Sequence, residues 1–142
     1  GRPVTATPFH YAFHVTDLAS TRRFYCDTLG CVEGRSTDAW VDFDFFGHQL
    51  SAHVHASPPQ PLWTGQVDGV TVPMPHFGAI IPWDRFQALA RRLEEVEVPF
   101  IVPPRIRYEG RPGEQATMFF EDPSGNAIEI KAFRNPDDVF AR

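Results

Sequence analysis

The sequence predicts an α+β protein built from two repeated units, and three observations support this class. A histidine opens each of two short apolar strands, at 9–15 and 76–81, so that His10 and His76 are 66 residues apart in a chain of 142. Each strand runs into a turn and then an amphipathic helix. Near the C-terminus, two strand-like runs flank a cluster of turn-forming residues at 122–126 and predict a β-hairpin over 116–133.

The first unit should continue with one helix after its opening strand. Thr16 or Asp17 is a suitable N-cap, and an apolar stripe at helical spacing predicts a helix over 17–29 that ends at Gly30. Three further strands are expected at 31–35, 39–46 and 49–55.

The last strand of the first unit should separate apolar from polar side chains, because strand residues alternate between the two faces. The apolar members, which should face the helix, are Leu50, Ala52 and Val54. The polar members are Gln49, Ser51, His53 and His55. If all strands belong to one sheet, the polar members face the same cavity as His10 and as Glu129, a side-chain carboxylate in the last predicted strand.

The stretch 56–75 is rich in Ser, Pro and Gly and shows no clear periodic pattern. Such a segment is either a linker or a functional loop, and here it should connect the two units. Trp63 is expected either to lie over a pocket or to cap the interface between the units, and the sequence leaves both readings open.

The second unit repeats the order of the first. A helix is expected over 83–96, with its apolar side formed by Phe86, Leu89, Ala90 and Leu93. Strands are expected at 99–102, 105–108, 115–121 and 127–133. Pro103 and Pro104 should interrupt the ladder between the first two of these strands. The remaining stretch, 134–142, is expected to be a short tail with one helical turn from Pro136.

The closing hairpin carries a carboxylate on a strand. The turn Asp-Pro-Ser-Gly-Asn at 122–126 suits a tight reversal of the chain, because Pro fixes φ while Gly and Asn tolerate the left-handed region. In the strand that follows, alternation places Ile128 and Ile130 on one face. Glu129 and Lys131 lie on the other face.

Composition bounds the class of protein. A chain of this length is normally one compact domain, and 42% hydrophobic and 22% charged residues are ordinary for a soluble protein. The net charge of -5 and the scattered arginines argue against a nucleic-acid partner. No run approaches the roughly 18 apolar residues of a membrane span. Cys26 and Cys31 lack metal-site spacing, so we expect free thiols in a reducing cytoplasm.

Two strands that each open with a histidine, followed by a hairpin that carries a glutamate, resemble the pattern of the vicinal oxygen chelate superfamily. This superfamily includes glyoxalase I, extradiol dioxygenases, fosfomycin-resistance proteins and bleomycin-binding proteins. The resemblance runs from about Pro8 to Phe133 and rests on His10 seven residues before Asp17, on His76, and on Glu129 seven residues after Asp122. It implies one domain of two βαβββ modules, about 8–55 and 76–133, that form a cupped mixed β-sheet around a metal site with the helices on the outer face. It also suggests a homodimer.

The resemblance implies that His10, His76 and Glu129 bind one divalent metal ion. Two imidazoles and one carboxylate form the facial triad that suits non-haem Fe(II), which we favour, while Zn, Ni, Co or Mn would fit the same ligands. Glyoxalase-like members place a Glu or Gln on the fourth strand as a fourth ligand. Here that strand offers Gln49 and His53, and the sequence does not choose between them.

Further residues are expected near the metal. His53 or His14 could act as a general base, because an imidazole titrates near neutral pH, and of the two we assign catalysis to His53. Tyr108 could donate a hydrogen bond to a substrate oxygen. The residues expected to contact substrate are His14, Gln49, Trp63, Arg107 and Phe119. Each histidine has the alternative of a structural, hydrogen-bonded role, and the arginine has that of a solvated surface charge.

The favoured function is therefore a metal enzyme that chelates two vicinal oxygens of a small-molecule substrate, with an extradiol-type dioxygenase first. A glyoxalase I-like lyase or isomerase is the next candidate. A metal-free drug-binding module, like the bleomycin-binding members, is the alternative outside enzymes. Such a binder has no need of His, His and Glu at the three ligand positions.

Overall fold

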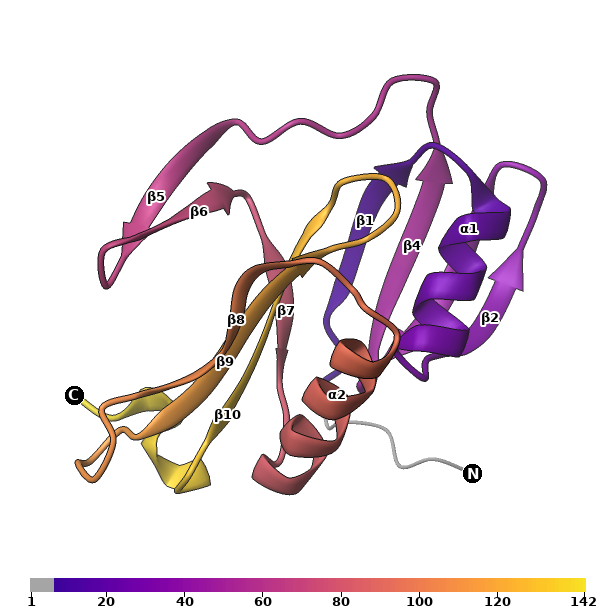
Figure 1. Cartoon of the computed structure of the whole chain (residues 1–142). Helices are drawn as coiled ribbons and strands as arrows, with labels where there is room; N and C mark the ends of the chain where they lie inside the picture. The colour runs from indigo at the N-terminus through magenta and orange to yellow at the C-terminus, as the bar shows by residue number, and fades with distance from the viewer. Residues whose placement is uncertain (1–6) are drawn as a thin grey trace. The chain divides into compact units, whose positions relative to one another are not determined.

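The computed structural model describes residues 7–142, which form two compact units (Figure 1). Unit 1 runs to Gln60 and also takes in Asp122–Asn126. Unit 2 comprises Pro61–Glu121 and Ala127–Arg142. The turn of the C-terminal hairpin therefore belongs to unit 1, whereas the two strands that it joins belong to unit 2.

Unit 1 is one βαβββ module, as predicted. Its elements are β1 (His10–Val15), α1 (Leu18–Arg22), η1 (Arg23–Thr28), β2 (Val32–Ser36), β3 (Trp40–Phe45) and β4 (His48–Val54). The sheet has the order β1-β4-β3-β2, in which β1 and β4 are parallel and the other neighbours are antiparallel. The helical segment covers one face of this sheet (Figure 1).

The first helix differs from the prediction of one continuous α-helix over 17–29. The Asp17 side chain caps α1 by accepting the Ser20 N–H at 2.7 Å, but the second half, η1, is π-helical. There the Leu29 N–H donates to the Phe24 carbonyl five residues earlier, at 2.9 Å. Gly30 ends the segment with φ of 80°, as expected of a glycine in this position.

The core of unit 1 lies between η1 and the sheet. The alternation predicted for β3 and β4 is confirmed for its buried members, which are Val41, Phe43, Phe45, Leu50 and Ala52. Tyr25 of η1 is fully buried and stacks on Phe43 with ring centroids 5.1 Å apart. Val54, which was expected on the same face, is 43% exposed at the end of β4.

Unit 2 repeats the module and adds a hairpin before it. The hairpin strands are β5 (Trp63–Val67) and β6 (Val70–Met74). The module elements are β7 (Phe77–Ile80), α2 (Trp83–Glu95), β8 (Phe100–Arg107), β9 (Gln115–Glu121), β10 (Ala127–Phe133) and η2 (Pro136–Phe140). The strand order β7-β10-β9-β8, with β7 and β10 parallel, matches that of unit 1. The α+β class and the two βαβββ modules are thus confirmed.

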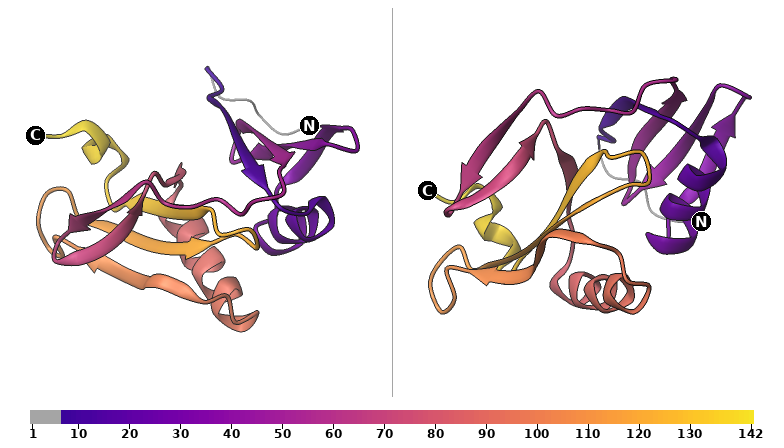
Figure 2. Two further views of the ribbon diagram at one scale, coloured as in Figure 1. Left: turned by 90° about the horizontal axis from the view of Figure 1, so that it is seen from above. Right: turned by 45° about the horizontal axis from the view of Figure 1, so that its top comes forward.

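The hairpin β5–β6 corrects the prediction of an unpatterned connection over 56–75. Asp68 and Gly69, with φ of 49° and 76°, form the two-residue turn that suits tight hairpins. Val72 is fully buried in a cluster with Val102 of β8 and Phe119 of β9. The hairpin therefore covers one face of the sheet of unit 2, and α2 lies on the other face (Figure 2).

The prolines of β8 do not end the strand. The structure has one strand over Phe100–Arg107, and its register with β9 shifts between Val102 and Arg105. A bulge at an edge strand absorbs proline, because the missing N–H faces outward rather than into the ladder. The predicted helix over 83–96 and the helical turn from Pro136 are confirmed within a residue or so.

Two features bear on the class of protein. Cys26 and Cys31 are not joined in a disulfide. Within residues 7–142, no helix has the length and apolar character that a bilayer crossing requires.

Candidate metal centre

Glu129 is opposite Phe119 of β9, so it lies on the face of the unit 2 sheet that the β5–β6 hairpin covers. In β10, Ile128 and Ile130 are buried toward α2, so alternation turns Glu129 and Lys131 to the opposite face. Glu129 is opposite Gly78 of the parallel strand β7. A Cβ at Gly78 would lie 1.5 Å from the Glu129 carbonyl oxygen, so only glycine permits this close approach of the two strands.

His76 and Glu129 form a pair. His76 Nε2 lies 3.4 Å from Glu129 Oε1, and Thr117 Oγ1 donates to Glu129 Oε2 at 2.6 Å. His76 Nδ1 is 2.9 Å from the Pro73 carbonyl oxygen. Because a carbonyl only accepts, Nδ1 carries a proton and Nε2 is the atom presented to the carboxylate. The imidazole ring also meets the Phe119 ring edge-on, with centroids 5.0 Å apart.

The pair shifts the pKa of both members. The hydrogen bond to Glu129 raises the pKa of His76 above its ordinary value, against the opposing effect of burial. Burial alone would raise the pKa of Glu129, but hydrogen bonds from His76 and Thr117 and the charge of Lys131 outweigh it and lower the pKa. The carboxylate is therefore held as an anion near neutral pH, which is the form that binds a cation.

His10 occupies the related position in unit 1. It opens β1, is opposite Gln49 of β4, and its Nδ1 lies 2.7 Å from Gln49 Oε1. The acceptor is again a carbonyl oxygen, so Nε2 of this histidine is also left available. Both predicted histidine ligands thus have one nitrogen committed to a carbonyl, an arrangement common in metal-binding histidines.

The open face of the unit 1 sheet is polar, as the alternation predicted. Gln49 engages His10 through its carbonyl oxygen, and His53 Nε2 lies 3.0 Å from Ser51 Oγ. The His14 ring meets the His55 ring edge-on at 5.5 Å between centroids. The location of these side chains in one cavity with Glu129 stays a prediction, because Glu129 belongs to unit 2.

The structure brings together two of the three predicted ligands. His76 and Glu129 are paired in unit 2, while His10 belongs to unit 1. In the described part of the chain, no group of three or more His, Cys, Asp or Glu side chains is close enough to share a metal ion. The donors of the pair still fit a divalent cation, since one imidazole Nε2 and one carboxylate fixed by Thr117 converge on the same face.

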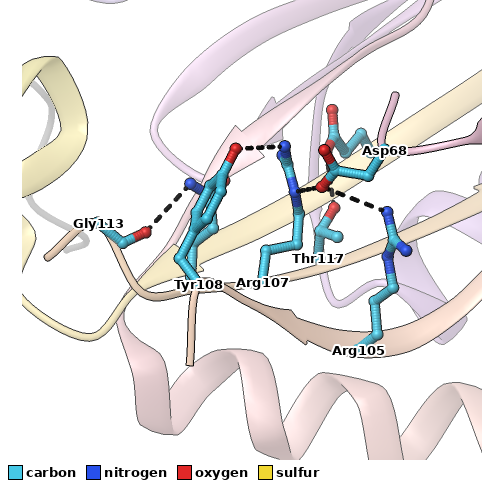
Figure 3. A network of polar contacts seen from close by, with 8 residues as sticks. Asp68, Arg105, Arg107, Tyr108, Gly113 and Thr117 are labelled. Carbon is cyan, nitrogen blue, oxygen red and sulfur yellow. Dashed lines mark hydrogen bonds and ion pairs between the residues drawn. The ribbon is translucent and has the colours of Figure 1, made fainter. Parts of the chain in front are cut away.

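Unit 2 also carries a polar network near Thr117, the residue that donates to Glu129 (Figure 3). Arg107 Nε donates to Asp68 at the tip of the β5–β6 hairpin, and its Nη2 donates to Tyr108 Oη at 3.0 Å. Arg105 Nη2 lies 3.9 Å from the same Asp68 oxygen. Tyr108 has a left-handed φ of 57° at the end of β8, an uncommon conformation for a residue of this size.

The two aromatic residues predicted to contact substrate, Phe119 and Trp63, differ in burial. Phe119 is buried under the hairpin and reaches His76 with its ring, so it contacts the pair from inside the fold. Trp63 is 62% exposed on β5, opposite Met74. Sequence reasoning missed Thr117 and Asp68. The signal for Thr117 was its place two residues before Phe119, on the same face of β9 as that residue.

The sequence profile of the Glyoxalase/Bleomycin resistance protein/Dioxygenase superfamily matches residues 7–130. The chain belongs to this superfamily. The vicinal oxygen chelate resemblance drawn from the two histidines and the hairpin carboxylate is thereby confirmed.

Solved structures of the superfamily fold agree. A glyoxalase/bleomycin resistance protein/dioxygenase from Alicyclobacillus acidocaldarius is 27% identical with a TM-score of 0.77, over 95% of this chain and 97% of that one. Fosfomycin resistance protein FosX from Listeria monocytogenes is 18% identical with a TM-score of 0.69, over 95% and 98%. A glyoxalase/dioxygenase from Nostoc punctiforme is 20% identical with a TM-score of 0.68, over 92% of both chains. No curated protein sequence matches the chain.

Proposed function

We propose that this protein is a mononuclear divalent-metal enzyme that chelates two vicinal oxygens of a small substrate. The observation that carries the proposal is the His76–Glu129 pair, in which Nδ1 is committed to a carbonyl and the carboxylate is fixed by Thr117. His10 is the third ligand, contributed by the same chain or by the second copy in a homodimer. Fe(II) is favoured, and Zn, Ni, Co or Mn would suit the same donors.

The surrounding residues take positioning and proton-transfer roles in this proposal. When bound, the metal ion supplies Lewis acidity to the oxygens that it holds. The Pro73 carbonyl orients His76, and Gln49 orients His10. His53 accepts a proton from a substrate hydroxyl, and Tyr108 donates a hydrogen bond to a substrate oxygen.

Within this class we favour an extradiol-type dioxygenase. A glyoxalase-type site would use a fourth protein ligand from β4, but the Gln49 carbonyl oxygen is already engaged by His10 Nδ1. Three protein ligands leave room for a bidentate substrate and dioxygen, which supports ring cleavage over isomerisation. A lyase or isomerase is the second candidate because the same scaffold hosts several chemistries.

The test is metal-dependent oxygen uptake. Protein reconstituted anaerobically with Fe(II), Ni(II) or Zn(II) is mixed with catechols under oxygen, and uptake is compared with the absorbance of ring-cleaved product. We expect uptake with Fe(II) alone, in equal amounts to the catechol consumed. Glu129→Gln should lower it by roughly a hundredfold or more, and Glu121→Gln, at the exposed end of β9, should leave it unchanged.

Other outcomes would redirect the assignment. Turnover of a hemithioacetal with Ni(II) or Zn(II), and no catechol cleavage with Fe(II), would contradict the dioxygenase and favour the glyoxalase-type reaction. Ligand binding that is unchanged by chelators and by Glu129→Gln would contradict a metal enzyme and favour a drug-binding module.

A further inference from the structure

Unit 2 contains a second feature on the face that carries Glu129, a pocket of about 460 Å³. It lies beside the ends of β8, β9 and β10 and the C-terminal segment. Its lining includes Arg107, Tyr108, Gln115, Lys131, Phe133 and Arg142. Arg107, Gln115 and Phe133 are cross-strand neighbours, so their side chains emerge on one face of the sheet.

The pocket is rich in positive charge. Three cations, those of Arg107, Lys131 and Arg142, line it against one carboxylate, that of Asp138. Asp138 already accepts the Gly113 N–H at 2.9 Å. Lys131 is the only lysine of the chain. Its backbone carbonyl accepts the Ile81 N–H, but its ammonium forms no hydrogen bond or ion pair with the residues that the structure describes. A partly buried ammonium without an acceptor favours an anion beside it.

Arg107 indicates which anion the pocket suits. Its Nε is paired with the Asp68 carboxylate, which also lies near Arg105, so two guanidinium groups share one carboxylate. Its Nη2 is aligned by Tyr108 Oη, and the side chain is only 14% exposed. The network shows that a carboxylate fits this guanidinium. Because Asp68 already pairs with Arg107, the positive charge on this face that has no carboxylate of the described residues within ion-pair distance is that of Lys131.

The remaining walls are aromatic and amide groups. Tyr108 and Phe133 supply ring surfaces, and the Arg107 guanidinium lies over the Tyr108 ring at 5.0 Å. Gln115 is 7% exposed, and its buried Oε1 accepts no hydrogen bond from the described residues. An unsatisfied buried acceptor at a pocket wall is costly unless a ligand or water donates to it. Cations beside aromatic rings suit an arylalkanoic acid.

We infer that this pocket binds the carboxylate of the substrate. The inference rests on the proposed function, because it concerns the same substrate. Lys131 is two residues from Glu129 on one strand face, which places the two positions about 7 Å apart. A molecule with vicinal oxygens on a ring and a carboxylate on a short side chain would span that distance. The substrate class is thus an aromatic acid that carries two neighbouring oxygens.

The test separates the pocket from the metal. Metal-free protein is titrated calorimetrically with 3-phenylpropionate, which lacks vicinal oxygens, and with 3-phenylpropionamide. We expect the acid to bind and the amide to bind roughly tenfold more weakly or not at all. Lys131→Met and Arg107→Met should each lower the affinity for 3-phenylpropionate by roughly tenfold or more, and Lys131→Arg should retain binding. Arg91→Met, on the exposed side of α2, is the matched control and should bind like the unmodified chain.

A spectroscopic readout follows the pocket directly. Reductive methylation with ¹³C-formaldehyde preserves the positive charge and labels only Lys131 and the α-amino group. The Lys131 resonance should move with the acid and not with the amide. Equal binding of acid and amide, unchanged binding in Lys131→Met, or no binding of the acid would each overturn the inference. None of these results bears on metal binding at Glu129, so the proposed function stands or fails separately.

Discussion

The two units share one topology, but they differ at the residue that lies opposite the first strand of the module, β1 in unit 1 and β7 in unit 2. In unit 1, the residue two places after His10 is Ala12, and it is opposite Ser51. In unit 2, the residue two places after His76 is Gly78, and it is opposite Glu129. The same site in the repeat therefore carries a hydroxyl in one unit and a carboxylate in the other.

The difference extends to the backbone that supports the site. Gly78 lets β10 approach β7 more closely than a Cβ would permit, whereas Ala12 carries a Cβ at the related position. His76 is oriented by a backbone carbonyl, while His10 is oriented by the side chain of Gln49. The repeated scaffold thus pairs a histidine with a carboxylate in unit 2 only, where a backbone carbonyl rather than a side chain orients the histidine.

The largest expected effect comes from filling the space at Gly78. Gly78→Ala places a Cβ 1.5 Å from the Glu129 carbonyl oxygen, so β7 and β10 must separate. We expect a loss of about 3 kcal/mol in the free energy of unfolding, measured by urea denaturation. Metal affinity should fall as well, since Glu129 moves with its strand.

The matched control is Gly34→Ala in the edge strand β2, where the nearest side-chain atom would be an ordinary 3.5 Å from the new Cβ. We expect this change to alter the free energy of unfolding by less than about 1 kcal/mol. If Gly78→Ala lowered the free energy of unfolding no more than Gly34→Ala does, the close approach of β7 and β10 would not distinguish the two units.

Tyr25→Phe tests the support of unit 1. Tyr25 Oη donates to Asp122 Oδ2 at 2.9 Å, and both residues are buried. Loss of the donor leaves a buried carboxylate with fewer partners, so we expect a loss of about 2 kcal/mol. Thermal unfolding measures it. An unchanged midpoint would contradict the role of this bond in holding 122–126 to unit 1.

The same bond predicts an alkaline dependence. Burial, and then the Asp122 charge, raise the pKa of Tyr25 well above its ordinary value. The folded state therefore keeps the phenol proton above about pH 10, where the unfolded chain releases it. The contribution of Tyr25 to the free energy of unfolding should be constant below that pH. Above it, the contribution should fall by about 1.4 kcal/mol per pH unit. Urea denaturation from pH 9 to 11 should show this slope, and Tyr25→Phe should remove it.

The smallest expected effect is at the hairpin tip of unit 2. Asp68→Asn removes an exposed carboxylate from Arg105 and Arg107, and exposed ion pairs contribute little. We expect only a small loss in the free energy of unfolding, below that of the two changes above, measured by urea denaturation. A loss of several kcal/mol would mean that the Asp68 contact, rather than the cluster around Val72, fixes the hairpin.

Much of the fold was predictable because alternation and helical spacing are local signals. They located both modules, the face of Glu129 and the polar face of β4. The β5–β6 hairpin was missed since Pro73 and the neighbouring Ser, Pro and Gly residues mask its pattern, although the Asp68-Gly69 pair was a usable turn signal.

Other features depend on contacts that the sequence does not encode locally. The π-helical turn of η1 coincides with the packing of Tyr25 on Phe43, a tertiary contact. The bonds of Glu129 to Thr117 and of Arg107 to Asp68 depend on strand register and on where the hairpin lies. Residue type and spacing therefore singled out His76 and Glu129, which the structure pairs, but not the groups that orient them.

We infer that unit 2 carries a metal-binding pair that unit 1 lacks. The deciding measurement is metal content, determined by elemental mass spectrometry after anaerobic reconstitution and desalting. We expect one equivalent in the unmodified chain, its loss in Glu129→Gln, and full retention in Ser51→Ala, the counterpart change in unit 1. One equivalent retained by Glu129→Gln, or no metal in the unmodified chain, would contradict the claim.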